Sequence, residues 1–261
     1  MDFLSPLKSE LKLKILLDLL PNGKNLSGLK SSIGTRETTI LHILEEFGEL
    51  SLTTKSQGVY KLTSLGVIET QILSQLSAAV EVVGTFGDFW LSHDISSIPA
   101  PLLFRLGALK DSSLVRNESS DLGKVHDTFM QVLLSSKKIR GISPIFHPDY
   151  VAAVRYLLSQ GNSVELVLTS SVLKKTLDSA ESELLVKYVA DGNLVIFLKE
   201  DLKVALTVTE KSFSLGLFDL EGEYDYSVDL ISLNHEAVEW GEDLFRGVVN
   251  ESRMFAPGQT A

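Results

Sequence analysis

The chain has 261 residues, 44% of them apolar, and a formal net charge of −10. This length favours two domains, one small and one medium, with enough apolar side chains for packed cores. The lack of cysteine excludes disulfides, zinc ribbons, iron-sulfur clusters and thiol catalysis. No run approaches the roughly 18 apolar residues of a membrane span, and residues 1–20 lack a signal-peptide layout, so we expect a cytoplasmic protein without membrane contact.

The charge is divided unevenly along the chain. Residues 1–66 hold eight Lys or Arg against seven Asp or Glu, whereas residues 67–261 hold sixteen against twenty-seven. An acidic C-terminal part repels phosphates, which leaves the N-terminal part as the place for a nucleic-acid contact. Its near-neutral charge predicts weak binding by one copy, and therefore a homodimer.

Three short helices are predicted near the N-terminus. Apolar residues recur every three or four positions over residues 5–20 and again over residues 25–33. Gly34 suits the tight turn that follows the second helix. The third helix is expected to begin with Thr35 as its N-cap and to bury an apolar stripe over residues 40–47.

A β-hairpin is predicted directly after the third helix. Short strands at residues 50–52 and 59–62 flank a polar, glycine-containing loop at residues 53–58. Helices in this order followed by such a wing are the layout of a winged helix-turn-helix domain, which we place at residues 1–64. A protein-interaction domain could have the same elements, but the agreement of helix order, turn and wing favours double-stranded DNA as the partner.

Side chains outside the core of this domain are candidate DNA contacts. The start and open face of the third helix and the hairpin carry residue types that bind phosphates or base edges. The candidate DNA-binding residues are Lys30, Thr35, Arg36, Thr38, Thr39, His42, Lys55, Ser56 and Lys61. Leu41 also lies outside the apolar stripe, where a thymine methyl or the wing itself could cover it.

An apolar stripe continues along the next predicted helix, at residues 65–86. Its members are spaced three or four positions apart and are Leu65, Ile68, Ile72, Leu76, Ala79 and Val83. Such a stripe suits a dimer seam. It also suits a helix that packs on its own C-terminal domain, because about three heptads are short for a coiled coil.

Residues 87–254 are expected to form an α/β domain around a mixed sheet, used for sensing or dimerisation. Residues 89–134 have a helical pattern throughout. Within it, Pro99 and Pro101 open one helical segment at residues 102–109, and another lies at residues 121–134. Short strands are predicted at residues 139–143, 164–169, 194–198, 204–208 and 213–218. Helices are predicted at residues 148–159, 172–189 and 235–253, and a disordered tail is predicted at residues 255–261.

Five segments of this domain resemble a known family. They read FWLSHDISSIPAPLLFRLGAL, IRGISPIFHPDY, SVELVLTSSVL, SLGLFDLEGEYD and EAVEWGEDLF, at residues 89–109, 139–150, 163–173, 214–225 and 236–245. In this order they resemble archaeal regulators of methanogens that join a winged helix to a characteristic middle domain, among them regulators of filament formation and of methyltransferase genes. The resemblance implies control of methanogenesis-related transcription in an archaeon, with an effector that differs between members.

The same domain also resembles, at a lower level, the phospholipase-D-like sensor domains of sugar-responsive archaeal regulators. Catalytic members of that superfamily carry a His-x-Lys pair. The residues two positions after the five histidines here are Leu44, Ile95, Thr128, Asp149 and Ala237. Without the nucleophilic histidine and phosphate-holding lysine, we expect a ligand-binding remnant and not an enzyme.

Two other constellations could suggest chemistry. His147 and Asp149 could be a base and its orienter, but an acid beside Pro148 suits the first turn of a helix. The acids at residues 219–225 lack the loop length and closing glutamate of a calcium site, so a hairpin turn is favoured. No glycine-rich phosphate loop follows a strand, and we expect no metal or other cofactor.

Candidate effector-binding residues lie at strand ends, where crevices form in α/β sheets. They are His147, Tyr150, Arg155, Thr169, Ser170 and Tyr224. Each has a structural alternative, since the tyrosines could be core edges, Arg155 a surface charge, and Thr169 with Ser170 a helix cap. We therefore predict a homodimeric transcription regulator with a small-molecule effector; the alternatives are an adaptor without an effector and an enzyme with an accessory winged helix.

Overall fold

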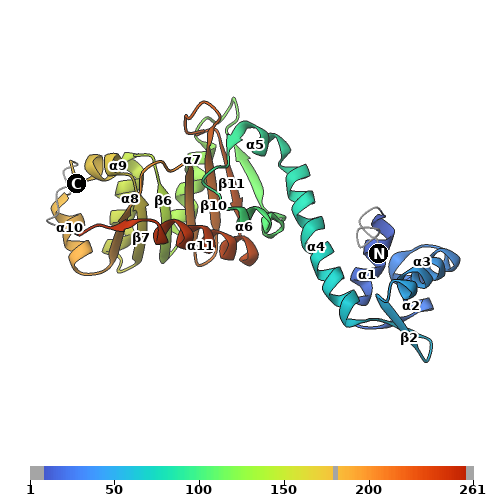
Figure 1. Cartoon of the computed structure of the whole chain (residues 1–261). Helices are drawn as coiled ribbons and strands as arrows, with labels where there is room; N and C mark the ends of the chain where they lie inside the picture. The colour runs from blue at the N-terminus through green and yellow to red at the C-terminus, as the bar shows by residue number, and fades with distance from the viewer. Residues whose placement is uncertain (1–8, 179–181, 257–261) are drawn as a thin grey trace. The chain divides into compact units, whose positions relative to one another are not determined.

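The computed structural model of the chain describes residues 9–178 and 182–256. The chain divides into two compact units, Met1–Glu81 and Val82–Ala261, which are described separately below (Figure 1). The division falls inside helix α4, Ser64–Thr85, whereas we predicted domain boundaries near the two ends of this helix. No helix among the described residues is both long and apolar enough to cross a membrane.

The first unit joins a helical bundle to a small antiparallel sheet. Besides the start of α4, its helices are α1 (Glu10–Leu19), α2 (Leu26–Ile33) and α3 (Glu37–Glu49). Its strands are β1 (Lys24–Asn25), β2 (Thr53–Ser56) and β3 (Val59–Leu62), in the order β1-β3-β2. The predicted helices and hairpin are confirmed, although residues 5–8 of the first predicted helix lie outside the described residues. The apolar spacing of the sequence did not predict strand β1.

Two residues set the path between α2 and α3. Asn25 caps α2, since its side chain accepts the N–H of Gly28 at 2.8 Å. Gly34 ends α2 with φ 74°, in the left-handed region that glycine adopts without strain. The prediction of Thr35 as the cap of α3 is wrong: Arg36 occupies the N-cap position, and no side chain caps this helix.

The hairpin is tighter than predicted. The prediction of the first strand at residues 50–52 is wrong, because these residues lie in a turn. Residues 53–56 form strand β2 instead of a loop, consistent with the β-branched side chains of Thr53 and Thr54. The turn consists of Gln57 and Gly58 alone, with φ 49° and 78°, which are values typical of a two-residue hairpin turn. Lys55 therefore lies on a strand and not at the hairpin tip.

The core of the first unit lies between α1, α2, α3 and the sheet. Apolar side chains that share this core include Ile15, Leu29, Ile40, Phe47, Leu52, Tyr60 and Leu73. Leu41, whose covering was left open by the sequence, packs against this core. Because the apolar side of α3 is buried in this core, the opposite side of the helix faces solvent.

The second unit is built on a mixed sheet, with nine strands in the part of the chain that the structure describes. The strand order is β12-β8-β7-β6-β9-β10-β11-β5, and β4 pairs with β10. β6, β7 and β8 are parallel, and the other pairs are antiparallel. The strands are β4 (His93–Asp94), β5 (Ser113–Arg116), β6 (Lys138–Ser143), β7 (Ser163–Leu168), β8 (Leu194–Leu198), β9 (Val204–Thr209), β10 (Phe213–Asp219), β11 (Val228–Ser232) and β12 (Arg253–Met254).

Helices cover both faces of this sheet. They are α5 (Gly87–Ser92), α6 (Ala100–Leu103), the 3-10 helix η2 (Leu106–Leu109), α7 (Lys124–Leu134), α8 (Pro148–Ser159), α9 (Ser170–Leu177), α10 (Ser182–Ala190) and α11 (His235–Asn250). α11 packs on one face, where a Cβ at Gly241 would lie 2.7 Å from both Phe213 and Val208. Its Trp240 donates Nε1–H to the carbonyl of Leu102 at 2.9 Å. The other face packs on α7, α8, α9 and α10.

Several element predictions for this unit need correction. Residues 89–134 are not helical throughout, because β4 and β5 lie among them, and β11 was missed. The helix predicted at residues 172–189 is assigned as α9 and α10, and the last helix ends at Asn250, so that Arg253 pairs with β8. Phe255, which we placed in the tail, donates its N–H to Ile196 at 2.8 Å and is held at the sheet edge. Residues 257–261 of that tail lie outside the described residues.

Candidate functional site

The start of α3 presents a polar surface on the first unit. Arg36, Thr38, Thr39 and His42 are exposed, opposite the buried stripe of the same helix, and Thr35 is half-buried. These side chains were predicted together from the helical spacing. The structure places them over the first two turns of one helix.

The N-terminal end of α3 is open to an anion. No side chain caps it, so first-turn N–H groups and the positive end of the helix dipole face outward. The exposed guanidinium of Arg36 adds a positive charge at this end, and the exposed carboxylate of Glu37 in the same turn is paired with Lys30. Farther along the helix Glu45 and Glu49 are exposed, so the surface there is acidic. Phosphate contacts by α3 are therefore restricted to its first turns.

The predicted lysines also make contacts within the unit. Lys30 Nζ lies 3.0 Å from Glu37 Oε1. Lys55 Nζ lies 4.9 Å from the centre of the Tyr60 ring. The side chains of Lys30, Lys55, Ser56 and Lys61 are exposed, so each can reach solvent or a phosphate.

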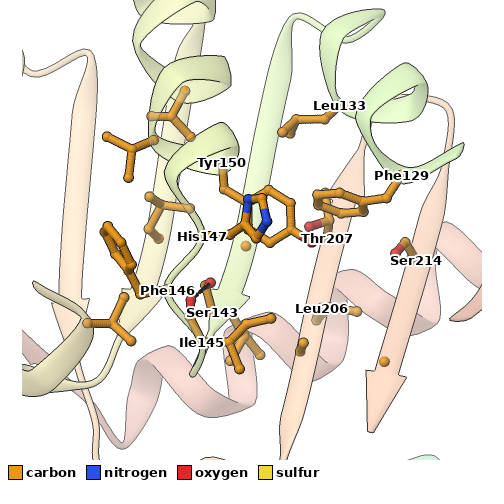
Figure 2. Close-up of a pocket in the computed structure, with 18 of the residues that line it drawn as sticks. Phe129, Leu133, Ser143, Ile145, Phe146, His147, Tyr150, Leu206, Thr207 and Ser214 are labelled. Atoms are coloured by element: carbon orange, nitrogen blue, oxygen red, sulfur yellow. Dashed lines mark hydrogen bonds between the residues drawn. The ribbon is translucent and has the colours of Figure 1, made fainter. Parts of the chain in front are cut away.

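The second unit holds a cavity of about 270 Å³ on the sheet face that packs on α7 and α8. Small residues of the central strands line it, namely Gly141 of β6, Ala205 of β9 and Gly216 of β10. Its lining reaches from Leu194 on β8 to Asp229 on β11, across six neighbouring strands of the described sheet. Figure 2 shows Phe129, His147 and Tyr150 gathered beside the strands that carry Thr207 and Ser214.

The cavity brings together half of the predicted effector-binding residues. His147, Tyr150 and Tyr224 line it, whereas Arg155, Thr169 and Ser170 do not. Thr169 instead caps α9, because its hydroxyl accepts the N–H of Val172 at 3.2 Å. The N–H of Ser170 donates to Glu200 at 2.9 Å. The helix-cap alternative therefore accounts for Thr169, and Ser170 occupies the first turn of the same helix.

Asp229 is a cavity residue that the sequence reasoning missed. Its Oδ2 accepts the hydroxyl of Ser214 at 2.6 Å, and its Oδ1 has no hydrogen-bond partner among the described residues. Burial raises the pKa of Asp229 to about 7, although the hydrogen bond from Ser214 opposes this rise. The sequence could have pointed to Asp229, because it is a charged residue inside the apolar run at residues 228–232.

Tyrosines lie at the same end of the cavity. Tyr224 and Tyr226 have ring centroids 4.7 Å apart in a T-shaped pair. A Cβ at Gly216 would lie 2.1 Å from the Tyr224 hydroxyl oxygen, so glycine makes room for this ring over β10. Burial, and then the nearby Asp229 carboxylate, raise the pKa of Tyr150 to about 12 and that of Tyr224 well above its ordinary value. Both phenols stay neutral near neutral pH.

Two histidines form a cluster where α7 and α8 meet the cavity. His126 Nε2 lies 3.1 Å from Asp149 Oδ2, and the rings of His126 and His147 have centroids 4.8 Å apart. Within the described residues, these three side chains offer atoms close enough together to hold a metal ion. His147 Nδ1 accepts the backbone N–H of Asp149 at 3.2 Å and so caps α8. This is the helix-start role that we favoured for the pair.

The acids at residues 219–225 form a turn, as predicted. Asp219 Oδ1 accepts the N–H groups of Glu221 and Glu223 at 3.0 and 2.9 Å. Gly222 has φ 94°, which suits the tight reversal. The hairpin explanation for this acidic cluster is confirmed.

Two family models match the chain. The N-terminal domain of the methanogenesis regulatory protein FilR1 matches residues 4–81, and its middle domain matches residues 122–251. The methanogenesis regulatory protein FilR1 of Methanothrix harundinacea (strain 6Ac) is 35% identical over 256 residues, which is 96% of this chain. The chain belongs to the FilR1 family. It spans 57% of the length of that relative.

This membership confirms the resemblance to regulators of methanogens. The FilR1 N-terminal match contains the polar start of α3, and the FilR1 middle match contains the cavity residues from Leu122 to Asp229. Members are described as methanogenesis regulatory proteins, which is a regulatory and not a catalytic role. Both candidate sites thus lie in segments that define the FilR1 family.

Solved structures give weaker likenesses. TrmBL2, described as an archaeal chromatin protein with a novel mode of DNA binding, is 11% identical, with 95% of this chain and 96% of that chain covered and a TM-score of 0.45. The phospholipase D family member Nuc from Salmonella typhimurium is 15% identical, with 55% and 98% covered and a TM-score of 0.40. Such TM-scores do not establish a shared fold. A phospholipase-D-like middle domain therefore stays a prediction.

Proposed function

We propose that the chain is a DNA-binding transcription regulator that acts as a homodimer on methanogenesis-related genes. The observation that carries this proposal is the exposed polar start of α3, presented by a helix-turn-helix with a wing in a member of a regulatory family. The proposal places the chain in the cytoplasm, where archaeal DNA lies.

The first turns of α3 are proposed to enter the major groove. Arg36 is placed to contact a phosphate or a guanine edge, and Thr38, Thr39 and His42 to contact neighbouring bases or phosphates. The exposed side chains of Lys30, Lys55, Ser56 and Lys61 would hold the flanking backbone. Thr35, half-buried and not the helix cap, would add a contact beside Arg36.

A second copy of the chain is the proposed partner of the apolar stripe on α4. Leu65, Ile68, Ile72 and Leu76 are 38%, 57%, 60% and 43% exposed. The opposite side of the helix is buried in its own unit, where Leu73 is 2% exposed. A helix with one apolar side buried and another uncovered, at spacings of three and four, favours a helix-to-helix seam between copies.

The cavity of the second unit is the proposed effector site. An effector changes DNA affinity only if it binds one arrangement of the dimer better than another. The mostly apolar walls with few polar groups match the usual form of small-molecule sites, and the volume of about 270 Å³ suits a ligand at the small end of their range. An adaptor without an effector would have no use for such a site.

The DNA-binding proposal is tested by titrating the full chain on its own promoter DNA and on random DNA across a salt series. We expect specific binding whose affinity falls with rising salt, because phosphate contacts release counterions. Arg36→Ala should weaken promoter binding by roughly tenfold, the effect of losing one charged contact.

Lys14→Ala is the matched control. Lys14 is an exposed cation of the same unit, on α1, whose Nζ lies 2.5 Å from Glu10 and which is not among the proposed contacts. This variant should bind promoter DNA like the wild type. Equal weak binding to both DNAs, or an Arg36 variant indistinguishable from the wild type, would refute the assignment of α3.

A further inference from the structure

We propose that the cavity binds an amphiphilic organic cation, a protonated amine whose charged end pairs with Asp229 and whose apolar part extends toward β8. This deepens the proposal that the cavity is an effector site. It does not depend on DNA binding.

The two ends of the cavity differ in chemistry. At one end Asp229, Ser214, Tyr224 and Tyr226 of β10, β11 and the segment between them contribute carboxylate and hydroxyl groups. At the other end the lining is apolar and includes Phe146, Leu166, Leu168, Leu194 and Ile196. The outer strands β8 and β11 are five strand spacings apart, roughly 24 Å. A ligand that fills such a space has one polar end and a long apolar part.

The charge at the polar end is negative once Asp229 has lost its proton, and burial raises the pKa of this carboxyl group to about 7. Among the described residues that line the cavity there is no lysine or arginine, and Asp229 is the buried carboxylic acid. Tyr150 and Tyr224 remain neutral phenols, because burial and Asp229 raise their pKa values. His147 and His126 also line the cavity, and both bond to Asp149: His147 Nδ1 accepts its N–H at 3.2 Å, and His126 Nε2 lies 3.1 Å from its Oδ2. A cation entering the cavity meets the ionised carboxylate of Asp229 and no lysine or arginine among the described lining residues.

Asp229 keeps an unused bonding capacity. Ser214 satisfies Oδ2, while Oδ1 is buried without a hydrogen bond of good geometry among the described residues. The backbone N–H groups of Leu230 and Leu215 lie near the carboxyl group and lower its pKa, but neither makes such a bond. A buried acceptor without a donor costs about 1–3 kcal/mol, so a donor supplied by a ligand would be favoured. An ammonium supplies both the hydrogen bond and the opposite charge.

The aromatic side chains near Asp229 favour a cation further. Tyr224, Tyr226 and Tyr150 line the cavity, and the faces of aromatic rings attract ammonium groups. Neutral alcohols gain no such attraction, and carboxylates are repelled by Asp229. The predicted order of affinity for ligands with the same tail is therefore amine, then alcohol, then carboxylate.

The experiment is isothermal titration calorimetry of the full chain with hexylamine, hexanol and hexanoate, without DNA, at a pH above the raised pKa of Asp229, which is about 7. These probes share one alkyl chain and differ in charge. We expect hexylamine to bind at least about tenfold more tightly than either of the others, the factor given by about 1.4 kcal/mol. Hexylamine that does not bind, or that binds no better than hexanol or hexanoate, would overturn the proposal, and this comparison needs no variant.

The variant Asp229→Asn then tests whether the charged end of the ligand binds at Asp229. The substitution keeps the size of the side chain and an oxygen for Ser214 while it removes the negative charge, so the preference for hexylamine over hexanol should disappear. Asp191→Asn, an exposed acid after α10, should keep the preference. If a folded Asp229→Asn variant still preferred hexylamine over hexanol, the proposal that the cation pairs with Asp229 would be refuted. Because no DNA is present, failure here is distinct from failure of the DNA-binding proposal.

Discussion

Asp229 is a carboxylic acid at a position of β11 flanked by buried apolar side chains. Burial raises its pKa from 3.8 to about 7, so the folded chain holds this proton to higher pH than the unfolded chain does. The contribution of Asp229 to the free energy of unfolding is therefore fully present below about pH 4. It is lost as the pH rises through about 7.

Replacement of Asp229 by Asn removes this titration. We expect the variant to gain stability relative to the wild type as the pH rises from about 4 to about 7, by at most about 1.4 kcal/mol per pH unit. Urea denaturation at a series of pH values measures this difference. A stability difference that stays constant over the range would show that the pKa of Asp229 is not raised.

Gly216 is a second residue on which the cavity depends. A Cβ there would lie 2.1 Å from the Tyr224 hydroxyl oxygen, so Gly216→Ala must displace the half-buried ring of Tyr224. We expect a loss of about 1–3 kcal/mol in the free energy of unfolding, as for other overpacked sites. Gly247→Ala is the control with the opposite sign: nothing lies near that Cβ, and alanine favours a helix interior by up to about 1 kcal/mol. If Gly216→Ala were as stable as the wild type, the close contact with Tyr224 would be refuted.

At the scale of elements, α4 carries the proposed dimer seam. Ile72, near the middle of its stripe, is 60% exposed. Ile72→Asp would place a charge in the seam of the homodimer, where no partner compensates its desolvation, so we expect mostly monomer in sedimentation velocity. Gln71→Asp adds the same charge beside the stripe and should leave the dimer intact.

The alternative for α4 makes the opposite prediction. If the stripe packs on the chain's own C-terminal domain, Ile72→Asp should lower the melting temperature without changing the sedimentation coefficient expected for a monomer. A wild-type chain that sediments as a monomer at all concentrations would contradict the seam.

The sequence predicted those elements that depend on residues close together in the chain. The helices of the first unit follow from apolar spacing, and Gly34 with its positive φ marks the turn before α3. β5 and β11 were missed because β5 has four residues at the end of the sheet path and β11 is interrupted by Asp229. Strand pairing, which is not a local property, decides both.

At the scale of the whole molecule, the two candidate sites differ in how far the sequence predicted them. The exposed start of α3 could be predicted, because one helix and its spacing define it. The cavity could be predicted only in part, since it forms where α7, α8 and strands from β6 to β11 meet. His147 and Tyr150 were found by their place after a strand, but Asp229 becomes a cavity residue only through the register of β10 and β11.

The central claim is that two copies of the chain bind DNA through α3. Hydroxyl-radical footprinting of the full chain on its own promoter tests this claim most directly. We predict two protected half-sites about one helical turn apart, 10–10.5 base pairs from centre to centre or a multiple of it. Arg36→Ala should protect both only at a roughly tenfold higher protein concentration. A single protected half-site, or no protection at concentrations where the chain is folded, would contradict the account.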